Sequence, residues 1–321
     1  MTKYESLSEK ASAQQDHDDE IDLRQLLGTL WAGKWLILAM TILFAAGGVA
    51  YALSKPDVYQ SSVLLAPANE EGGMGGLSGQ LGGLASLAGI NIGSSGSNRT
   101  VIAKEVLRSR AFLADFIERH DLAAPLMGVK GWNIEKSEWQ YDREVYNPET
   151  GQWLLDKDGK SQEPTDWDLV KAFKQKHLSV SENQENGMVT FSVKSLSPLA
   201  AQQWGQWLVE DINEHMRQQD VAEAEARIDY LENKLTDTNI AGMQQVFYQL
   251  IESETRTVML ANAQREYVFK TIDPAVVPQE KSEPKRALIA ILAIMLGGML
   301  GIFIVFLRSF FKGDAKPEEE I

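Results

Sequence analysis

Two uncharged apolar runs, residues 35–53 and 287–307, restrict this chain to a narrow set of architectures. A membrane-spanning helix needs about 20 mostly apolar residues, because its backbone polar groups must be satisfied internally across roughly 30 Å of hydrocarbon. Both runs meet this requirement, and neither has the regularly spaced polar residues of an amphipathic core helix. The sequence therefore predicts two transmembrane helices. Residues 54–286 would then lie on one side of the bilayer and both short ends, 1–34 and 308–321, on the other.

The net charge of −14 is acidic, and the spans carry none of it. Residues 54–286 hold 24 basic and 34 acidic side chains. Such a surface repels phosphate backbones, so we expect no nucleic acid partner. The basic residues that flank the two spans are nearly balanced in number, and the residues alone therefore leave the orientation open.

The region between the spans alternates between helical and extended patterns. We expect an amphipathic helix within 20–31, a strand at 58–67, helices at 99–120 and 166–176, and a last strand at 267–272. Two hairpins are predicted, at 145–154 and at 178–194, where Asn186-Gly187 is a strong turn signal. Residues 72–97 contain 10 glycines, and the role of this segment is left open. The order of these elements predicts an α+β fold.

The longest helical pattern covers residues 197–265. Ser197-Pro198 begins it, since Pro is favoured in the first turn of a helix. An interruption at 237–239 predicts a helical hairpin with its tip near Asn239. A hairpin this long exceeds the core it could pack on, so it should project from the domain and pack against its own return helix and neighbouring subunits. Its predicted apolar seam consists of Val221, Ala224, Ile228, Leu231, Leu235, Ile240, Met243, Phe247 and Leu250.

Searches for catalytic and cofactor motifs give nothing specific. The chain has no G-x-x-x-x-G-K-[ST] phosphate loop and no G-x-S-x-G elbow. No two of the four histidines are spaced i, i+4, and there is no cysteine to complete a metal site. Asp211 and His215 share one helix face, a pattern that favours a solvated contact over metal binding. We predict no catalytic residue, no metal site and no cofactor.

Two patterns point to binding or packing. In the second span Gly297 and Gly301 form G-x-x-x-G with Gly298 beside them, and small residues one turn apart let helices approach closely. This motif predicts helix packing within the membrane, with the same chain or with a partner. Aromatic residues are also concentrated in one stretch, where they serve either core packing or contact with a polymer. These residues are Trp132, Trp139, Tyr141, Tyr146, Trp153 and Trp167.

Three membrane-flanking motifs resemble those of a known family. The stretch 22–27 (Asp-Leu-Arg-Gln-Leu-Leu), with Leu30-Trp31 and Lys34-Trp35, precedes the first span, and 58–60 (Val-Tyr-Gln) follows it. A proline-spaced run leads into the second span: Pro274, Pro278, Pro284, Lys285 and Arg286. In these motifs and in its layout the chain resembles the Wzz-type chain-length determinants, which are polysaccharide co-polymerases of the bacterial inner membrane.

The resemblance implies cytoplasmic termini, a periplasmic domain over 54–286 and a homo-oligomer with an α/β base and a long outward helix. It implies a non-enzymatic regulator that sets the modal length of O-antigen, with a membrane polysaccharide polymerase and the lipid-linked glycan as partners. Residues 308–321 lack the phosphate loop and Tyr-rich tail of the kinase-bearing members, so the resemblance favours the kinase-less class. Two alternatives remain: a co-polymerase for capsule or exopolysaccharide export that works with a separate tyrosine kinase, and a polysaccharide-modifying enzyme.

Overall fold

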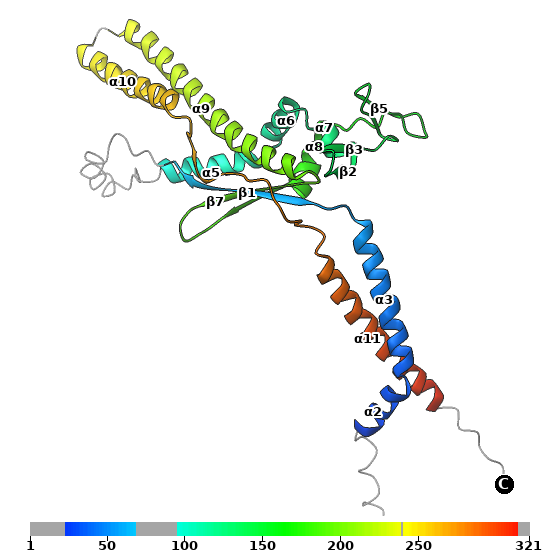
Figure 1. Cartoon of the computed structure of the whole chain (residues 1–321). Helices are drawn as coiled ribbons and strands as arrows, with labels where there is room; N and C mark the ends of the chain where they lie inside the picture. The colour runs from blue at the N-terminus through cyan, green and yellow to red at the C-terminus, as the bar shows by residue number, and fades with distance from the viewer. Residues whose placement is uncertain (1–22, 69–94, 239, 314–321) are drawn as a thin grey trace, which may run out of the picture. The chain divides into compact units, whose positions relative to one another are not determined.

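The computed structural model describes residues 23–68, 95–238 and 240–313 (Figure 1). The chain divides into two compact units, one formed by the two ends of the chain, 1–55 and 284–321, and the other by residues 56–283. The predicted α+β fold with two long apolar helices and a long helical hairpin is confirmed. Most of the Gly-rich segment, residues 72–94, lies outside the described residues, as does Asn239.

In the unit formed by the chain ends, the described residues form the helices α2 (Leu23–Ala32), α3 (Lys34–Ser54) and α11 (Arg286–Gly313). Lys34–Ser54 and Arg286–Phe311 are each long and apolar enough to cross a membrane. Helices α3 and α11 pack against each other along much of their length, and α2 also contacts α11. Trp31 and Trp35, at the junction of α2 and α3, are 74% exposed. Amphipathic rings in this position suit the headgroup layer of a bilayer.

The second unit is built on a four-stranded antiparallel sheet in the order β6-β7-β1-β8. Its strands are β1 (Tyr59–Pro67), β6 (Leu178–Glu182), β7 (Val189–Ser195) and β8 (Phe269–Asp273). The central pair is in register, with Val63 opposite Phe191, and buried residues alternate with less buried ones along β1. This period of two places the apolar side chains on one face, and that face is covered by helices.

The helix α9 (Pro198–Asp237) lies across the sheet with its first half and extends beyond it with its second (Figure 1). Ser197 caps the helix by accepting a hydrogen bond from the Ala200 N–H, and Pro198 occupies the first turn as predicted. The sheet-facing side from Ala200 to Met216 is buried, whereas beyond Met216 only Ala224 is. Helix α10 (Ala241–Ala263) returns alongside this outer half of α9.

Smaller elements complete the domain. They are the helices α5 (Ser95–Arg108), α6 (Arg110–Arg119), α7 (Ala123–Met127) and α8 (Asp166–Ala172), the π-helical turn Phe173–His177, and two hairpins, β2 (Val129–Asn133) with β3 (Glu138–Tyr141) and β4 (Tyr146–Asn147) with β5 (Gln152–Trp153). The helix predicted over 99–120 is divided, because Ser109 leaves helical geometry and caps α6 by accepting from the Phe112 N–H. The hairpin β2–β3 was not predicted.

One core joins these elements. Phe116, Phe173, Phe191 and Phe269 are fully buried, and with Leu208 and the other buried apolar residues they form a single cluster between the sheet, α9 and helices α5 to α8. A buried polar side chain fixes the last strand to α9. Asn213 accepts hydrogen bonds from the Val268 and Phe269 N–H groups at 2.8 and 2.9 Å and donates one to the Phe269 carbonyl at 3.0 Å. Both the side-chain oxygen and the side-chain nitrogen thus have a partner, as burial requires.

Candidate functional surfaces

The glycine motif of the second span lies in the contact between α3 and α11. Gly297 and Gly301 are buried against α3. A Cβ on Gly297 would lie 2.7 Å from the Phe44 Cβ, and one on Gly301 would lie 2.9 Å from the Ile37 Cα. Gly298 is different, because its nearest neighbour would be the Thr41 hydroxyl at 3.8 Å. Two of the three predicted glycines are therefore sites of close backbone approach between these two helices.

The close contact extends beyond the predicted motif. A Cβ on Gly48 would lie 2.5 Å from the Ala293 Cβ, and one on Gly33 would overlap the Val305 side chain. Ala293, Gly297, Gly301 and Val305 follow one another at intervals of four residues, which places them on one ridge of α11. The sequence carries a signal for this longer contact, because Ala293, Gly297 and Gly301 continue the four-residue spacing once alanine is counted as a small residue.

The predicted seam of the hairpin is only partly the contact between α9 and α10. Five of its members are partly buried and Ala224 is fully buried; these six are Val221, Ala224, Ile228, Leu231, Leu235 and Phe247. Ile240, Met243 and Leu250 are 62, 45 and 45% exposed. On α10 the side chains that are not exposed are Gln244, Phe247, Ile251, Glu254, Thr257, Val258 and Ala261.

A polar contact accompanies this shifted seam. Arg227 on α9 donates to Glu254 on α10 at 3.1 Å and to Glu223 one turn back at 2.9 Å. Glu254 is 22% exposed, and the guanidinium joins the two helices through it. The pair sets the relative position of the two helices more than it stabilises them, since exposed ion pairs contribute about 0–1 kcal/mol.

A second apolar face of α10 is left exposed. We call Met243, Val246 and Leu250 the outer stripe; their spacing of 3 and 4 residues places them on one helix face. Their side chains are 45, 51 and 45% exposed. Nothing among the described residues of the chain covers this face.

The proline-spaced motif divides between the two units. Pro274 and Pro278 belong to a segment that follows β8 and runs beside β1, where the Ser61 hydroxyl donates to the Val276 carbonyl at 2.8 Å and Val58 pairs with Glu283. Pro284, Lys285 and Arg286 belong to the other unit, in which Arg286 is the first residue of α11. The prolines suit a segment that donates few backbone hydrogen bonds and stays extended.

The predicted aromatic stretch mostly packs on itself and on the core. Trp132 and Trp139 meet edge to face at 5.0 Å across β2–β3, and Trp139 stacks on Trp204 of α9 at 6.3 Å. Tyr141 contacts Tyr146 at 5.3 Å, and Tyr146 contacts Trp153 at 5.0 Å across β4–β5. Trp167 differs, because it is 57% exposed with the Lys171 ammonium over its ring.

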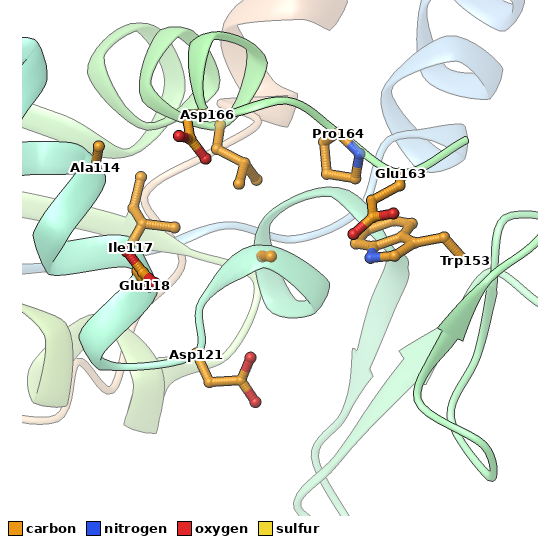
Figure 2. A pocket seen from close by; sticks show the side chains of 10 residues that line it. Ala114, Ile117, Glu118, Asp121, Trp153, Glu163, Pro164 and Asp166 are labelled. Atoms are coloured by element: carbon orange, nitrogen blue, oxygen red, sulfur yellow. The ribbon is translucent and has the colours of Figure 1, made fainter. Parts of the chain in front are cut away.

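A pocket of about 330 Å³ lies between α6, α7, α8 and the hairpin β4–β5 (Figure 2). Trp153, Glu163 and Pro164 lie on one side in the figure, and Ala114, Ile117 and Glu118 lie on the other. Its apolar floor includes Ile117 and Leu169, which are 2 and 7% exposed. Four carboxylates line the pocket, and no Lys or Arg does; the four are Glu118, Asp121, Glu163 and Asp166.

The described residues offer no group of three or more His, Cys, Asp or Glu side chains that could hold a metal ion. Asp211 turns toward α6 rather than pairing with His215. It contacts His120 Nε2 at 3.0 Å and Arg119 at 3.3 Å, and the His120 ring stacks on Trp207 at 4.2 Å. His215 meets the edge of the Phe112 ring instead. These contacts fasten α6 to α9.

The buried His177 makes stability depend on pH. Burial lowers the pKa of His177, and this outweighs the hydrogen bond of its Nδ1 with the Lys194 carbonyl at 2.7 Å. The folded chain therefore holds His177 neutral at pH values where an unfolded histidine, of ordinary pKa about 6.5, binds a proton. As the pH falls through 6.5 the unfolded state gains protons first, so the free energy of unfolding decreases until the pH passes the lower, folded pKa.

Unfolding of the detergent-solubilised chain at pH 7.5 and at pH 5.5 checks this expectation. The wild-type protein should lose stability on acidification, and His177→Gln, which keeps an N–H donor but cannot titrate, should lose less. An equal loss in the two proteins would show that another group causes the pH dependence.

The two apolar helices, the antiparallel α+β domain and the long hairpin define a membrane-associated protein with a large domain between two candidate spans. The profile of the chain length determinant protein family, Wzz, matches residues 19–120, and that of the G-rich domain on putative tyrosine kinases, GNVR, matches residues 236–310. The family resemblance seen in the sequence is confirmed by the match to the Wzz chain length determinant family over residues 19–120.

Two solved structures are among those similar to the chain. A full-length bacterial polysaccharide co-polymerase is 17% identical, and the match covers 93% of this chain and 100% of that one with a TM-score of 0.38. A fragment of WzzB, a polysaccharide co-polymerase from Salmonella Typhimurium, is 11% identical over 71% of this chain and 100% of that one, with a TM-score of 0.28. No curated protein matches the sequence.

Proposed function

We propose that this protein is a non-enzymatic regulator of polysaccharide chain length that sets the modal length of O-antigen made by a membrane polymerase. The Wzz match over residues 19–120 carries this proposal, because it covers α2, the first apolar helix and the first strand of the domain. The protein is anchored in the inner membrane by α3 and α11, with cytoplasmic termini and residues 54–286 in the periplasm. The polymerase and the lipid-linked glycan are its partners.

The active form in this proposal is a homo-oligomer. The outer stripe on α10 supports it, since Met243, Val246 and Leu250 form a continuous apolar face on a helix that has its own contact with α9 on another side. Apolar faces of this kind are typical of protein interfaces. The arrangement positions repeated copies of one domain above the membrane, and a scaffold acts through the geometry of that array rather than through bond making.

A second candidate has support of its own. The GNVR match over residues 236–310 favours a kinase-associated class, in which the protein acts as a co-polymerase for capsule or exopolysaccharide export and works with a separate tyrosine kinase. This match covers α10, the proline-spaced segment and most of α11. The two candidates share the scaffold mechanism and differ in the glycan that is controlled.

Gel analysis of surface glycans distinguishes the candidates. Deletion of the gene should replace a cluster of O-antigen lengths by an unregulated ladder, and complementation with this chain should restore the cluster. Loss of capsule or exopolysaccharide with an unchanged O-antigen ladder would favour the second candidate. If neither glycan changes, the protein does not control chain length.

A further inference from the structure

The pocket beside Trp153 combines features that none of the contacts described above uses. It is concave and has an apolar floor, an aromatic wall and a rim of carboxylates. Its volume of about 330 Å³ is at the small end of the range of about 300–1,000 Å³ for ligand pockets. It thus suits one compact unit of a ligand rather than an extended length of polymer. The pocket lies wholly within the domain of residues 56–283.

Separate elements hold the wall and rim in place. Trp153 is anchored by its pairing with Tyr146 in β4–β5, and the two rings meet at 5.0 Å. Thr165 caps α8 in a capping box with Asp168, and this fixes the start of the helix at Asp166. The floor residues Ile117 and Leu169 belong to the hydrophobic core. The pocket is therefore preformed by secondary structure.

Asp121 is placed where local stability would favour another residue. It follows α6 with φ of 51°, a left-handed conformation in which Gly or Asn is usual at a helix end. The Leu122 N–H bonds to the Ile117 carbonyl and the Asp121 N–H to the Glu118 carbonyl, so the turn is a Schellman motif. A carboxylate here, with Glu118 in the preceding turn, also meets the negative end of the helix dipole. Two local preferences are thus given up at the rim of the pocket.

The charges restrict the chemistry of the ligand. The four carboxylates form no salt bridge with described residues, and in the absence of lining Lys or Arg the pocket repels anions. Ionised carboxylates only accept hydrogen bonds, so a matching ligand must present donors. They do not converge into a metal-binding group among the described residues. Trp153 adds a face on which an apolar surface can stack.

We propose that this pocket binds a single neutral or amino sugar unit of the glycan, with the sugar ring stacked on Trp153 and its O–H or N–H groups donating to the rim carboxylates. Sugars of these classes have both required features, an apolar ring face and donors around its edge. Uronic and sialic acids carry a carboxylate that the rim repels. The proposal rests on the proposed function, in that it takes the ligand to be a glycan, and it adds the site and the sugar class.

Binding to the full-length chain in detergent tests the proposal, with maltotetraose and chitotetraose as neutral and N-acetylated probes and tetragalacturonic acid as the acidic probe. We expect saturable binding of maltotetraose, of chitotetraose or of both, and the bound probe should be recovered unhydrolysed. Tetragalacturonic acid should not bind. Trp153→Ala should weaken binding at least ten-fold, whereas Trp167→Ala, which removes an exposed ring outside the pocket, should leave it unchanged. Equal binding by the Trp153→Ala variant and the wild type overturns the proposal. Binding of tetragalacturonic acid also overturns it, as does a failure of both maltotetraose and chitotetraose to bind.

A second pair of variants guards against misfolding of the hairpin. Glu163→Gln combined with Asp166→Asn removes two rim charges at exposed positions, and Glu185→Gln removes an exposed charge in the turn between β6 and β7. The first should weaken binding several-fold at unchanged helix content, and the second should not. Unchanged binding in both counts against the proposal. The glycan gel of the deletion strain is read separately: an altered ladder combined with failed sugar binding rejects only this site, whereas an unaltered ladder rejects the proposed function itself.

Discussion

Replacing Gly301 or Gly297 by leucine should separate α3 from α11 and abolish the modal glycan length that we propose this protein sets. At Gly301 even a single added carbon would lie 2.9 Å from the Ile37 Cα, and at Gly297 it would lie 3.0 Å from the Met40 carbonyl. Both neighbours include backbone, which cannot rotate away as a side-chain end can. Overpacking of a well-packed contact typically costs about 1–3 kcal/mol, and the larger leucine side chain adds to the clash made by the first carbon.

The chain provides a control on the adjacent position and a direct readout. Gly298→Leu faces the Thr41 hydroxyl at 3.8 Å and should be tolerated. Because the protein has no cysteine, Thr41→Cys with Gly298→Cys reports the contact without background thiols. Mild oxidation should join this pair in a disulfide within one chain, so thiol labelling should be lost while the protein still migrates as a single chain. Adding Gly301→Leu should restore labelling. Normal modal length and continued cross-linking in the presence of Gly301→Leu would show that this contact does not matter for function.

The elements with strong local signals could be predicted from the sequence. Helix α9 begins where Ser197 and Pro198 predict it, and the β6–β7 hairpin turns at Asn186-Gly187, where Gly187 has φ of 67°. The β2–β3 hairpin lacks such a signal. Its turn at 134–137 includes Ser137 with φ of 52°, so an ordinary residue holds a conformation that usually requires glycine. Pairing of Trp132 with Trp139 and packing on Trp204 stabilise a turn that local preference does not favour.

The inward face of α10 was misjudged for a different reason. The predicted and the observed inward faces of α10 both contain Phe247. The predicted face was chosen because it adds the apolar residues Met243 and Leu250. The observed contact includes Gln244 and Glu254, which a hydrophobicity pattern rejects. The partnership of Glu254 with Arg227 on the opposite helix makes its partial burial acceptable, and a partner 27 residues away leaves no periodic signal.

The pocket could not be predicted at all from spacing. Its lining comes from α6 and the turn after it, from the start of α7, from β5, and from α8 with the segment that enters it. Trp153 belonged to a recognised aromatic group, but its proximity to Glu163 and Ile117 depends on tertiary packing. The glycine motif behaved in the opposite way, since a spacing of four residues on one helix fixes one face wherever that helix packs.

Introducing a charge into the outer stripe should dissociate the proposed homo-oligomer while the subunit stays folded. Leu250→Glu or Val246→Glu places a carboxylate on a face that is about half exposed in the single chain, so folding of the subunit should change little. In an assembly that covers this face the charge would be desolvated, which is costly without a partner. Light scattering of the solubilised protein should show loss of the large species at unchanged helicity, and modal glycan length should be lost with it.

The hairpin seam supplies the contrasting result. Phe247→Ala removes a residue of the contact between α9 and α10 and should lower the free energy of unfolding. A fully buried phenylalanine typically costs about 3–5 kcal/mol on truncation to alanine. The loss here should be smaller, because Phe247 is only partly buried. Gln249→Glu, at a neighbouring exposed position outside the stripe, should change neither the size of the assembly nor the free energy of unfolding. If Leu250→Glu and Gln249→Glu both leave the assembly intact, the stripe is not the contact between subunits. Dissociation by Leu250→Glu alone would separate assembly from folding on a single helix, because the outer stripe and the contact with α9 have no residue in common.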